Sequence, residues 1–396
     1  MRILYINSVY GYGSTGKLVR QLKEDAEAAG NEAFVIYGRK SAIGQKGTEV
    51  SESGVFLMEN SLEQKEDILF SVISDSHGLH SRRNTAKMIE KIKDIDPDLI
   101  HLHNIHGFYL NYPDLFAFLK SHGKPVVWTL HDCWAYTGFC AYYDYNECSG
   151  WQTGCKACRF RNEYPYRLFS RSAYNYKKKK EAYDGADLTL VTPSEWLKSE
   201  VQKSMLGSYP CRVIYNSVNL KDFCYDPGNV RQIYHLEGKK IYLACANVWT
   251  EQKGYQECLK LAAKLNDDEV LAMVGLSDKQ MKDMTEHMLG IAHCDIDRLR
   301  NWYSTCDAFF NPTLEDNYPT VNLEAAACGA PIITYRTGGS LESAGRNGIA
   351  VERYDTDDAL QKLRQAERNK MNANTAGNHM TEEYLALYEE ITGGNI

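Results

Sequence analysis

The sequence of 396 residues lacks any apolar run long enough to cross a bilayer. A transmembrane helix needs about 18 or more successive apolar residues, and no window approaches that length. The first apolar run, at residues 3–6, has the length of a strand and is too short for the core of a signal peptide. No small-residue cleavage site follows it. We therefore expect a cytoplasmic protein.

An excess of positive charge is also missing. The chain has 45 Lys and Arg residues against 52 Asp and Glu, for a formal net charge of −7. This balance argues against nucleic acid as the main partner and gives no general attraction to an anionic membrane. The chain is too long for one ordinary hydrophobic core, so two domains are expected.

Cysteine, by contrast, is plentiful. Twelve cysteines in a chain without an export signal are expected to be reduced thiols or metal ligands and not disulfides. Cys140, Cys148, Cys155 and Cys158 have the spacing C-x7-C-x6-C-x2-C. Four thiolates of this kind are able to hold a structural zinc, although the first two gaps are longer than in common zinc modules. Free cysteines in an aromatic loop are the alternative.

Short apolar runs alternate with helical stretches along most of the chain, which is typical of an α/β fold with parallel sheets. The rhythm breaks near residues 216–236 and then restarts. Two doubly wound domains place the ligand crevice at the carboxyl ends of the strands, between the halves. We expect an N-terminal domain of residues 1–215 plus 378–396, with a Cys-rich and aromatic insertion at 132–180, and a C-terminal domain of residues 216–377. The strands are expected at 3–6, 33–37, 98–103, 125–130, 188–191, 212–215, 241–246, 270–274, 308–311 and 331–335.

Residues 311–331 are the most informative segment. A strand is expected to end at Asn311, and the loop after it carries Glu315 and Asp316. Pro319 is expected at the first position of a helix, whose free N–H groups at Thr320 and Val321 suit a diphosphate. Glu324, about one turn into the helix, is placed to accept hydrogen bonds from ribose hydroxyls. An ordinary capped helix is the alternative interpretation.

The spacing Asp316-x7-Glu324 followed by Ala-Ala-Ala-Cys-Gly-Ala-Pro resembles the paired-carboxylate signature of retaining glycosyltransferases of family 4, which have the GT-B fold. The segments 101–104, 130–134, 194–197, 249–254 and 337–339 also resemble members that build bacterial exopolysaccharides of the colanic-acid type. The family signature normally begins with Glu, and this chain has Asp316 there. The resemblance implies two Rossmann-like domains facing each other across a cleft.

The resemblance also assigns roles to single residues. The donor nucleotide is expected against Glu324, and the sugar between His131 and Asp316, with Asn317 and Tyr318 in the same donor loop. His131 follows a strand directly, so it lies at the carboxyl edge of the sheet; a purely structural histidine is the alternative. His103 and Asn104 are candidate acceptor contacts.

Lys253 is expected to stabilise the charge that develops on the leaving diphosphate. The family commonly pairs this lysine with an arginine six residues earlier, where this chain has Asn247. Arg336 is a weak substitute for the missing cation. A solvated lysine at a helix start is the alternative for Lys253.

The glycine-rich loop at residues 11–16 matches the spacing G-x-G-x2-G of dinucleotide-binding folds. An NAD enzyme would also want an acidic residue after the second strand, but residues 38–40 are Gly, Arg and Lys. The glycosyltransferase interpretation is therefore favoured, and Ser14, Thr15 and Gly16 are expected near the donor phosphates.

Residues 159–180 are basic and aromatic, with Glu163 the only acid. They are expected either to dock on an anionic membrane, at the inner face of the plasma membrane, or to form a solvated helix face. No Asp-x-Asp run is placed like a metal site, so catalysis is expected to need no cofactor.

Together these features predict an enzyme that moves a sugar from a nucleoside-diphosphate sugar to a hydroxyl of a saccharide or lipid-linked saccharide, with retention, in bacterial surface polysaccharide synthesis. Two rivals stay open. A nucleotide-sugar epimerase uses the same architecture and needs no acceptor, and a non-catalytic nucleotide-sugar-binding protein would show no turnover.

Overall fold

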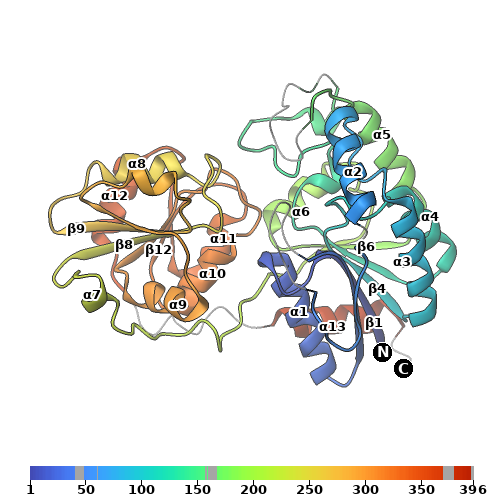
Figure 1. The fold of residues 1–396 in the computed structure, drawn as a ribbon, viewed down its shortest axis with the longest axis horizontal. Coiled ribbons are helices and arrows are strands. Elements are labelled where there is room, and N and C mark those ends of the chain that lie inside the picture. The colour runs from blue at the N-terminus through green and yellow to red at the C-terminus, as the bar shows by residue number, and fades with distance from the viewer. Residues whose placement is uncertain (41–48, 60, 157, 159–166, 369–378, 394–396) are drawn as a thin grey trace. The chain divides into compact units, whose positions relative to one another are not determined.

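The computed structural model describes residues 1–40, 49–59, 61–156, 158, 167–368 and 379–393 (Figure 1). The chain divides into two compact units, Met1–Tyr215 with Met380–Ile396, and Asn216–His379. Every strand pairing in both units is parallel among the residues described. Parallel pairing requires crossover connections, and helices supply them here.

The first unit is built on a seven-stranded sheet in the order β3-β2-β1-β4-β5-β6-β7. The order reverses direction at β1, which is the pattern of a doubly wound sheet. Its central strands are buried on both faces, so they consist of continuous apolar runs. The strands are β1 (Arg2–Val9), β2 (Glu32–Arg39), β3 (Val55–Leu57), β4 (Leu99–Leu102), β5 (Val126–Thr129), β6 (Leu188–Thr192) and β7 (Cys211–Val213).

Helices cover both faces of this sheet. Most of them bury apolar residues at helical spacing, as in α3, whose inner face carries Met88, Ile92 and Ile95. The helices are α1 (Gly13–Ala28), α2 (Ser61–Ser74), α3 (Arg82–Ile95), α4 (Tyr112–His122), α5 (Ser172–Tyr183), α6 (Glu195–Gln202) and α13 (Met380–Ile391).

The second unit repeats the design with a six-stranded sheet in the order β10-β9-β8-β11-β12-β13. Its strands are β8 (Lys240–Cys245), β9 (Glu269–Val274), β10 (Met288–Ile291), β11 (Ala308–Asn311), β12 (Ile332–Tyr335) and β13 (Gly348–Val351). Figure 1 shows α8 and α12 on one face of this sheet and α9 and α10 on the other. The helices are α7 (Val230–Ile233), α8 (Tyr255–Ala262), α9 (Ile296–Thr305), α10 (Thr320–Ala327), α11 (Ser340–Ala344) and α12 (Thr356–Gln365).

The predicted α/β class with two doubly wound, Rossmann-like domains is confirmed. The sequence analysis found ten strands and missed β3, β10 and β13. All three lie at sheet edges. Their sequences, Val-Phe-Leu, Met-Leu-Gly-Ile and Gly-Ile-Ala-Val, are apolar but only three or four residues long. So short an apolar run does not distinguish a strand from another buried segment.

The last helix, α13, returns to the first unit and packs against its sheet. Tyr388 Oη lies 2.6 Å from Nδ1 of His101, and Tyr384 Oη lies 2.8 Å from Oγ1 of Thr129. His101 and Thr129 belong to β4 and β5 and are themselves hydrogen-bonded at 2.7 Å. The C-terminal helix therefore holds two neighbouring strands whose next residues lead to the candidate site.

The aromatic insertion packs into the main hydrophobic core of the first unit. It contains the 3₁₀ turns η1 (Trp134–Tyr136) and η2 (Gly150–Thr153), and Trp134, Tyr136 and Trp151 are almost fully buried. The Lys179 ammonium lies over the Trp134 ring and donates to the carbonyls of Trp134 and Thr137. Burial lowers the pKa of Lys179 to about 7. Most of the basic segment between Arg159 and the start of α5 lies outside the described residues.

In the part of the chain that the structure describes, no helix has the length and apolar character needed to span a bilayer.

Candidate functional site

The loop between β11 and α10 carries the carboxylates that the sequence singled out. β11 ends at Asn311, and residues 312–319 lead from the carboxyl edge of the sheet to the first turn of α10. Asp316 is mostly buried, and its Oδ1 accepts a hydrogen bond from the Tyr318 amide at 3.2 Å. Glu315 and Asn317 are almost fully buried. The loop therefore has a fixed conformation.

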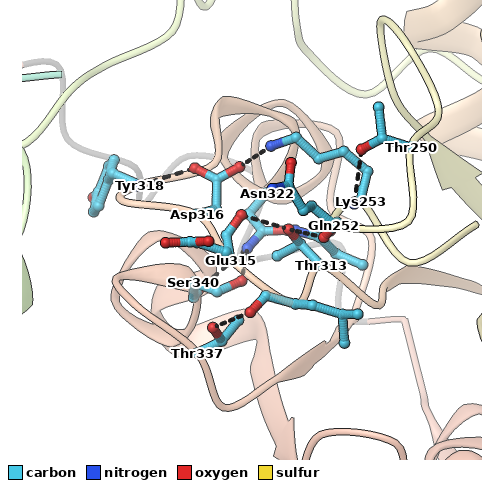
Figure 2. A network of polar contacts seen from close by, with 12 residues as sticks. Thr250, Gln252, Lys253, Thr313, Glu315, Asp316, Tyr318, Asn322, Thr337 and Ser340 are labelled. Carbon is cyan, nitrogen blue, oxygen red and sulfur yellow. Dashed lines mark hydrogen bonds and ion pairs between the residues drawn. The ribbon is translucent and has the colours of Figure 1, made fainter. Parts of the chain in front are cut away.

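Lys253 reaches this loop from the segment before α8. Its Nζ lies 2.5 Å from Oδ2 of Asp316, and Figure 2 shows the two side chains pointing toward each other. The Lys253 side chain is 36% exposed, so its ammonium stays accessible to a ligand. The structure thus brings together two of the three predicted catalytic residues.

Backbone contacts fix the two loops to each other. The Leu314 amide and the Thr313 hydroxyl both donate to the Gln252 carbonyl, at 2.7 and 3.3 Å. On the other side, the Thr337 hydroxyl donates to the Leu314 carbonyl at 2.9 Å. These threonines were missed in the sequence because single hydroxyls in loops give no pattern.

Two glycines permit this close approach. Gly338 has a φ of +48°, and a Cβ on it would lie 1.9 Å from the Asp316 carbonyl oxygen. Gly254 has a φ of +78°, and its Cβ would lie 2.2 Å from the Pro312 carbonyl oxygen. Only glycine combines a positive φ with so little space. The Gly339 amide then donates to the Asp316 carbonyl at 3.1 Å.

The N-terminus of α10 begins one residue later than predicted. Pro319 has a ψ of 118° and is the N-cap residue, so Thr320 is the first helical residue. Pro319 provides no side-chain cap, and Thr320 and Val321 are only partly buried. Amide groups at such a helix start carry partial positive charge and suit an anionic group.

Asn322 anchors α10 from within. Its Oδ1 accepts from Nδ2 of Asn311 at 2.9 Å, and its Nδ2 donates to the carbonyl of Ser340 and the hydroxyl of Ser343, both at 2.9 Å. The helix start is therefore tied to β11 and α11. Such a satisfied buried network holds one arrangement of the chain.

Glu324 lies one turn further along α10. It is partly exposed, and its Oε2 accepts a hydrogen bond from the hydroxyl of Tyr303 at 2.9 Å. Tyr303 is fully buried on α9, and burial raises its pKa well above the ordinary value. It therefore donates at any physiological pH and orients the carboxylate. Tyr303 was missed because its α9 position resembles an ordinary core aromatic.

Two other donor-side residues are placed at the surface. Asn247, which follows β8, is exposed. Arg336 pairs with Glu352 at 2.9 Å, and both side chains are largely exposed. In the described structure Arg336 therefore contacts Glu352, which follows β13, and not Asp316.

In the first unit, His131 directly follows β5 and Leu130. Its Nε2 lies 2.9 Å from Nδ1 of His103, and the two rings stack with centroids 5.2 Å apart. Burial lowers the pKa of His131 to about 4 and that of His103 well below its usual value, so both are neutral near pH 7. His103 is almost fully buried, which places it as support for His131.

Asp132 forms a second pair beside His131. Its Oδ2 lies 2.7 Å from Nε2 of His106, and its Oδ1 accepts from the Trp134 amide at 2.9 Å. Burial favours the protonated acid, but His106 and the Trp134 amide outweigh it and hold the pKa of Asp132 below its usual value. These groups line a small pocket together with His103 and Asn104. His106 was missed, although it lies three residues after His103.

Asn104 is partly exposed, and its amide donates to Oδ1 of Asn7 at 3.1 Å. The glycine-rich loop between β1 and α1 has Gly11 and Gly13 at positive φ, with the Gly11 amide donating to the Gly16 carbonyl at 2.9 Å. Ser14 is exposed, Thr15 is partly buried and Gly16 is buried. Tyr12, the N-cap residue, gives the first amides of α1 no side-chain cap.

The four cysteines of the insertion form no disulfide and lie near one another. A hydrogen bond with Cys158 and burial raise the pKa of Cys140, and burial raises that of Cys155 to about 11. Cys158 Sγ accepts from Arg167 at 2.9 Å, and Cys155 Sγ accepts from the Gly138 amide at 3.0 Å. Within the described part of the chain, no three His, Cys, Asp or Glu side chains are arranged to hold a metal ion. A structural zinc therefore stays a prediction.

The second unit thus combines a cation, two carboxylates and an uncapped helix start at one sheet edge. Such a set suits the diphosphate and ribose of a nucleotide. Two Rossmann-like units with this site define a glycosyltransferase of the GT-B fold.

Comparison with known families agrees. Residues 16–222 match the model of Glycosyltransferase Family 4, and residues 228–382 match that of Glycosyl transferases group 1. The chain belongs to Glycosyltransferase Family 4 and is an enzyme of the glycosyltransferase class.

Individual relatives support the same assignment. The chain is 26% identical over 320 residues to the putative colanic acid biosynthesis glycosyl transferase WcaC of Escherichia coli K12, which covers 74% of this chain and 77% of that protein. It is 24% identical over 210 residues to N,N'-diacetylbacillosaminyl-diphospho-undecaprenol alpha-1,3-N-acetylgalactosaminyltransferase of Campylobacter jejuni, over 46% of this chain and 54% of that one.

Solved structures share the fold at low identity. Sucrose-phosphate synthase from Thermosynechococcus elongatus has a TM-score of 0.65 at 16% identity, covering 100% of this chain and 97% of that chain. HepE of Anabaena, solved in complex with UDP-glucose, has a TM-score of 0.62 at 13% identity over 100% of this chain and 99% of that chain.

Proposed function

We propose that this protein transfers a sugar from a nucleoside-diphosphate sugar to a hydroxyl of a saccharide or lipid-linked saccharide, with retention of anomeric configuration, in the synthesis of a bacterial surface polysaccharide. The observation that carries the donor half is the Lys253–Asp316 pair in the loop before α10. The relative named as a putative colanic acid biosynthesis glycosyl transferase and the one whose name contains diphospho-undecaprenol support the acceptor half.

In this proposal the second unit binds the donor. The diphosphate takes the amides of Thr320 and Val321, and Glu324 accepts from the ribose hydroxyls. Asp316 holds sugar hydroxyls, with Asn317 and Tyr318 in the same loop. Lys253 stabilises the negative charge that builds up on the leaving diphosphate. His131 and the loop of Ser14, Thr15 and Gly16 contribute from the first unit, and His103 supports His131.

The chemical step follows from the donor. The acceptor oxygen forms a bond to the anomeric carbon while the bond from that carbon to the β-phosphate oxygen breaks. The acceptor proton passes to the departing phosphate oxygen, so the products are the new glycoside and a nucleoside diphosphate. The step as written requires no divalent metal.

The test is a thermal-shift and hydrolysis screen of the purified protein against UDP-, GDP-, ADP- and dTDP-sugars, with and without EDTA. The proposal predicts one donor that raises the melting temperature and slowly releases its nucleoside diphosphate, with no effect of EDTA. Absence of binding to every donor would refute the donor site. Conversion of the donor sugar without release of nucleoside diphosphate would show an epimerase. Binding of the donor without turnover would show a non-catalytic binding protein. The second alternative is the main rival, because Asn247 stands exposed where the family has an arginine.

A further inference from the structure

Helix α2 buries polar side chains and exposes large apolar ones, which is the reverse of an ordinary surface helix. Its fully buried side chains are Asp67 and Ser71, which hydrogen-bond to each other at 3.1 Å, and Asp67 also accepts from Ser81 at 2.6 Å. On the opposite side of the helix, four large apolar side chains are 43–72% exposed. These are Leu62, Leu69, Phe70 and Ile73.

An ordinary surface helix places its apolar stripe on the core and its polar side in water. The exposed side chains of α2 stand at positions i, i+7, i+8 and i+11, so they form one stripe and are not scattered. The buried polar side is fully hydrogen-bonded to its neighbours. The Phe70 ring stacks on His80 with centroids 5.2 Å apart, yet all four apolar side chains stay 43–72% exposed. A contiguous exposed patch of this kind marks an interaction site.

The chain that leads into α5 enlarges the stripe. Leu168 and Phe169 are 57% and 65% exposed, and the Leu168 amide donates to the Val72 carbonyl of α2 at 2.8 Å. The chain just after α2 also contacts the start of α5, where the Arg171 amide donates to Asp75. We call the six side chains Leu62, Leu69, Phe70, Ile73, Leu168 and Phe169 the apolar patch.

A buried ion pair holds this extension in place. Arg167 and Asp75 are both almost fully buried, with Nη1 and Oδ2 2.8 Å apart. Asp75 also accepts from the Arg171 amide at 2.6 Å, and its carbonyl accepts from Asn175 at 2.6 Å. Buried polar anchors on both sides of Leu168 and Phe169 therefore fix these two side chains in water.

Positive charge continues from the patch along α5. Arg171 and Lys178 lie over the exposed Tyr174 ring, 4.3 and 5.8 Å from its centroid, and the neighbouring Lys177 is 76% exposed. Glu181 is the one carboxylate paired with these lysines in the described structure. Three cations against one anion leave this side of the helix positive, although the whole chain carries a net charge of −7.

We propose that the apolar patch and the basic side of α5 dock this protein on an anionic lipid membrane, with the patch in the headgroup and acyl boundary and the cations on lipid phosphates. Apolar burial combined with a basic cluster gives stable but reversible membrane attachment. A second copy fits less well, because an isologous dimer uses the same surface of both subunits and would bring the same excess of cations from each into the interface. The docking requires no donor, so it stands independently of the proposed transfer; together they place a lipid-linked acceptor in the same membrane.

The experiment is co-sedimentation of the full chain with vesicles of phosphatidylcholine alone, or of phosphatidylcholine mixed with phosphatidylglycerol. The wild type is expected to bind the mixed vesicles and to dissociate as salt is raised. The double variant Leu168→Ser, Phe169→Ser should bind at least about ten-fold more weakly, because binding scales with buried apolar area. The variant Lys177→Glu, Lys178→Glu should lose the preference for phosphatidylglycerol.

The matched control is Ile233→Ser, which removes an apolar side chain of similar exposure, 58%, from the second unit. It should bind vesicles like the wild type. All variants alter exposed side chains, so melting temperature and donor hydrolysis should be unchanged, which separates this proposal from the proposed function. Failure of the wild type to sediment with anionic vesicles would overturn the docking. So would equal binding by the patch variant, or a lipid-free dimer that the patch variant converts to monomer.

Discussion

Lys253 Nζ and Asp316 Oδ2 lie 2.5 Å apart, although the two residues come from loops that follow different strands, β8 and β11. The two strands are neighbours in the second sheet, so their carboxyl ends bring both loops to the same edge. A cation and a carboxylate at this edge, beside the start of α10, form the center of the proposed donor site.

Replacement of Lys253 by Met should slow sugar transfer and donor hydrolysis by about 10²–10³-fold, because a positioned charge beside the leaving group is lost. Stability should change by less than about 1 kcal/mol, since the pair is partly exposed. Lys260→Met is the control, because Lys260 pairs with Glu257 at 2.7 Å on α8 away from Asp316. Release of nucleoside diphosphate measures the effect, and full turnover by Lys253→Met would contradict the role.

Replacement of Glu324 by Gln should weaken nucleotide binding by about ten-fold or more, since a charge-assisted hydrogen bond is lost. Tyr303→Phe removes only the hydroxyl that orients Glu324 and should have a smaller effect in the same direction. Calorimetric titration with the donor's nucleoside diphosphate gives both dissociation constants. An unchanged constant for Glu324→Gln would exclude contact with the nucleotide.

Gly338→Ala should displace the Asp316 loop, because the added methyl would lie 1.9 Å from the Asp316 carbonyl oxygen. We expect a loss of about 1–3 kcal/mol and a strong loss of donor binding. Gly238→Ala is a matched control, since Gly238 also has a positive φ, +75°, but nothing lies within 4 Å of its Cβ. Urea unfolding and thermal shift with donor separate the two effects, and identical behaviour of the variants would show that the close approach is unimportant.

Acid should destabilise the first unit. Burial holds the pKa of His101 and His103 well below 6.5 and that of His131 at about 4, so the folded state keeps them neutral. The free energy of unfolding is therefore highest with respect to these histidines above pH 6.5. It decreases as the pH falls from 6.5 toward 4, because the unfolded chain binds more protons than the folded chain in this range.

For each histidine that stays neutral in the folded state, lowering the pH from 6.5 to 5 should reduce the free energy of unfolding by up to about 2 kcal/mol. Urea unfolding at several pH values measures the slope. His101→Gln should flatten it, whereas His293→Gln should not, because His293 is exposed. A slope that His101→Gln leaves unchanged would place the titration elsewhere.

Zinc analysis tests the cysteine cluster. If Cys140, Cys148, Cys155 and Cys158 hold a structural ion, the purified protein should contain about one zinc per chain, and Cys140→Ser should lose it along with stability of the insertion. Elemental analysis of protein purified without chelator is the measurement. Metal-free protein with four titratable thiols at these positions would establish free cysteines.

Part of this molecule could be predicted from local pattern. Central strands such as β9 and β11 were found because their apolar runs, at residues 270–274 and 308–310, fit strands buried on both faces. The edge strands β3, β10 and β13 were missed because three or four apolar residues do not distinguish a strand from another buried segment. Asp316 and Glu324 were found because their spacing resembles the family signature, and Lys253 because it stands before Gly254 after the loop that follows a predicted strand.

The sequence by itself therefore determined the fold class, the family resemblance and the residue types of the donor site. Only the tertiary structure showed which residues hold the site residues in place. Tyr303 donates a hydrogen bond to Glu324, His103 is hydrogen-bonded to His131, and Gly338 allows the close approach of the Asp316 carbonyl. It also showed that the apolar side of α2 faces outward, which the sequence analysis did not detect. The physical reason is that composition and spacing report local preference, whereas the direction in which a side chain faces depends on residues far apart in the chain.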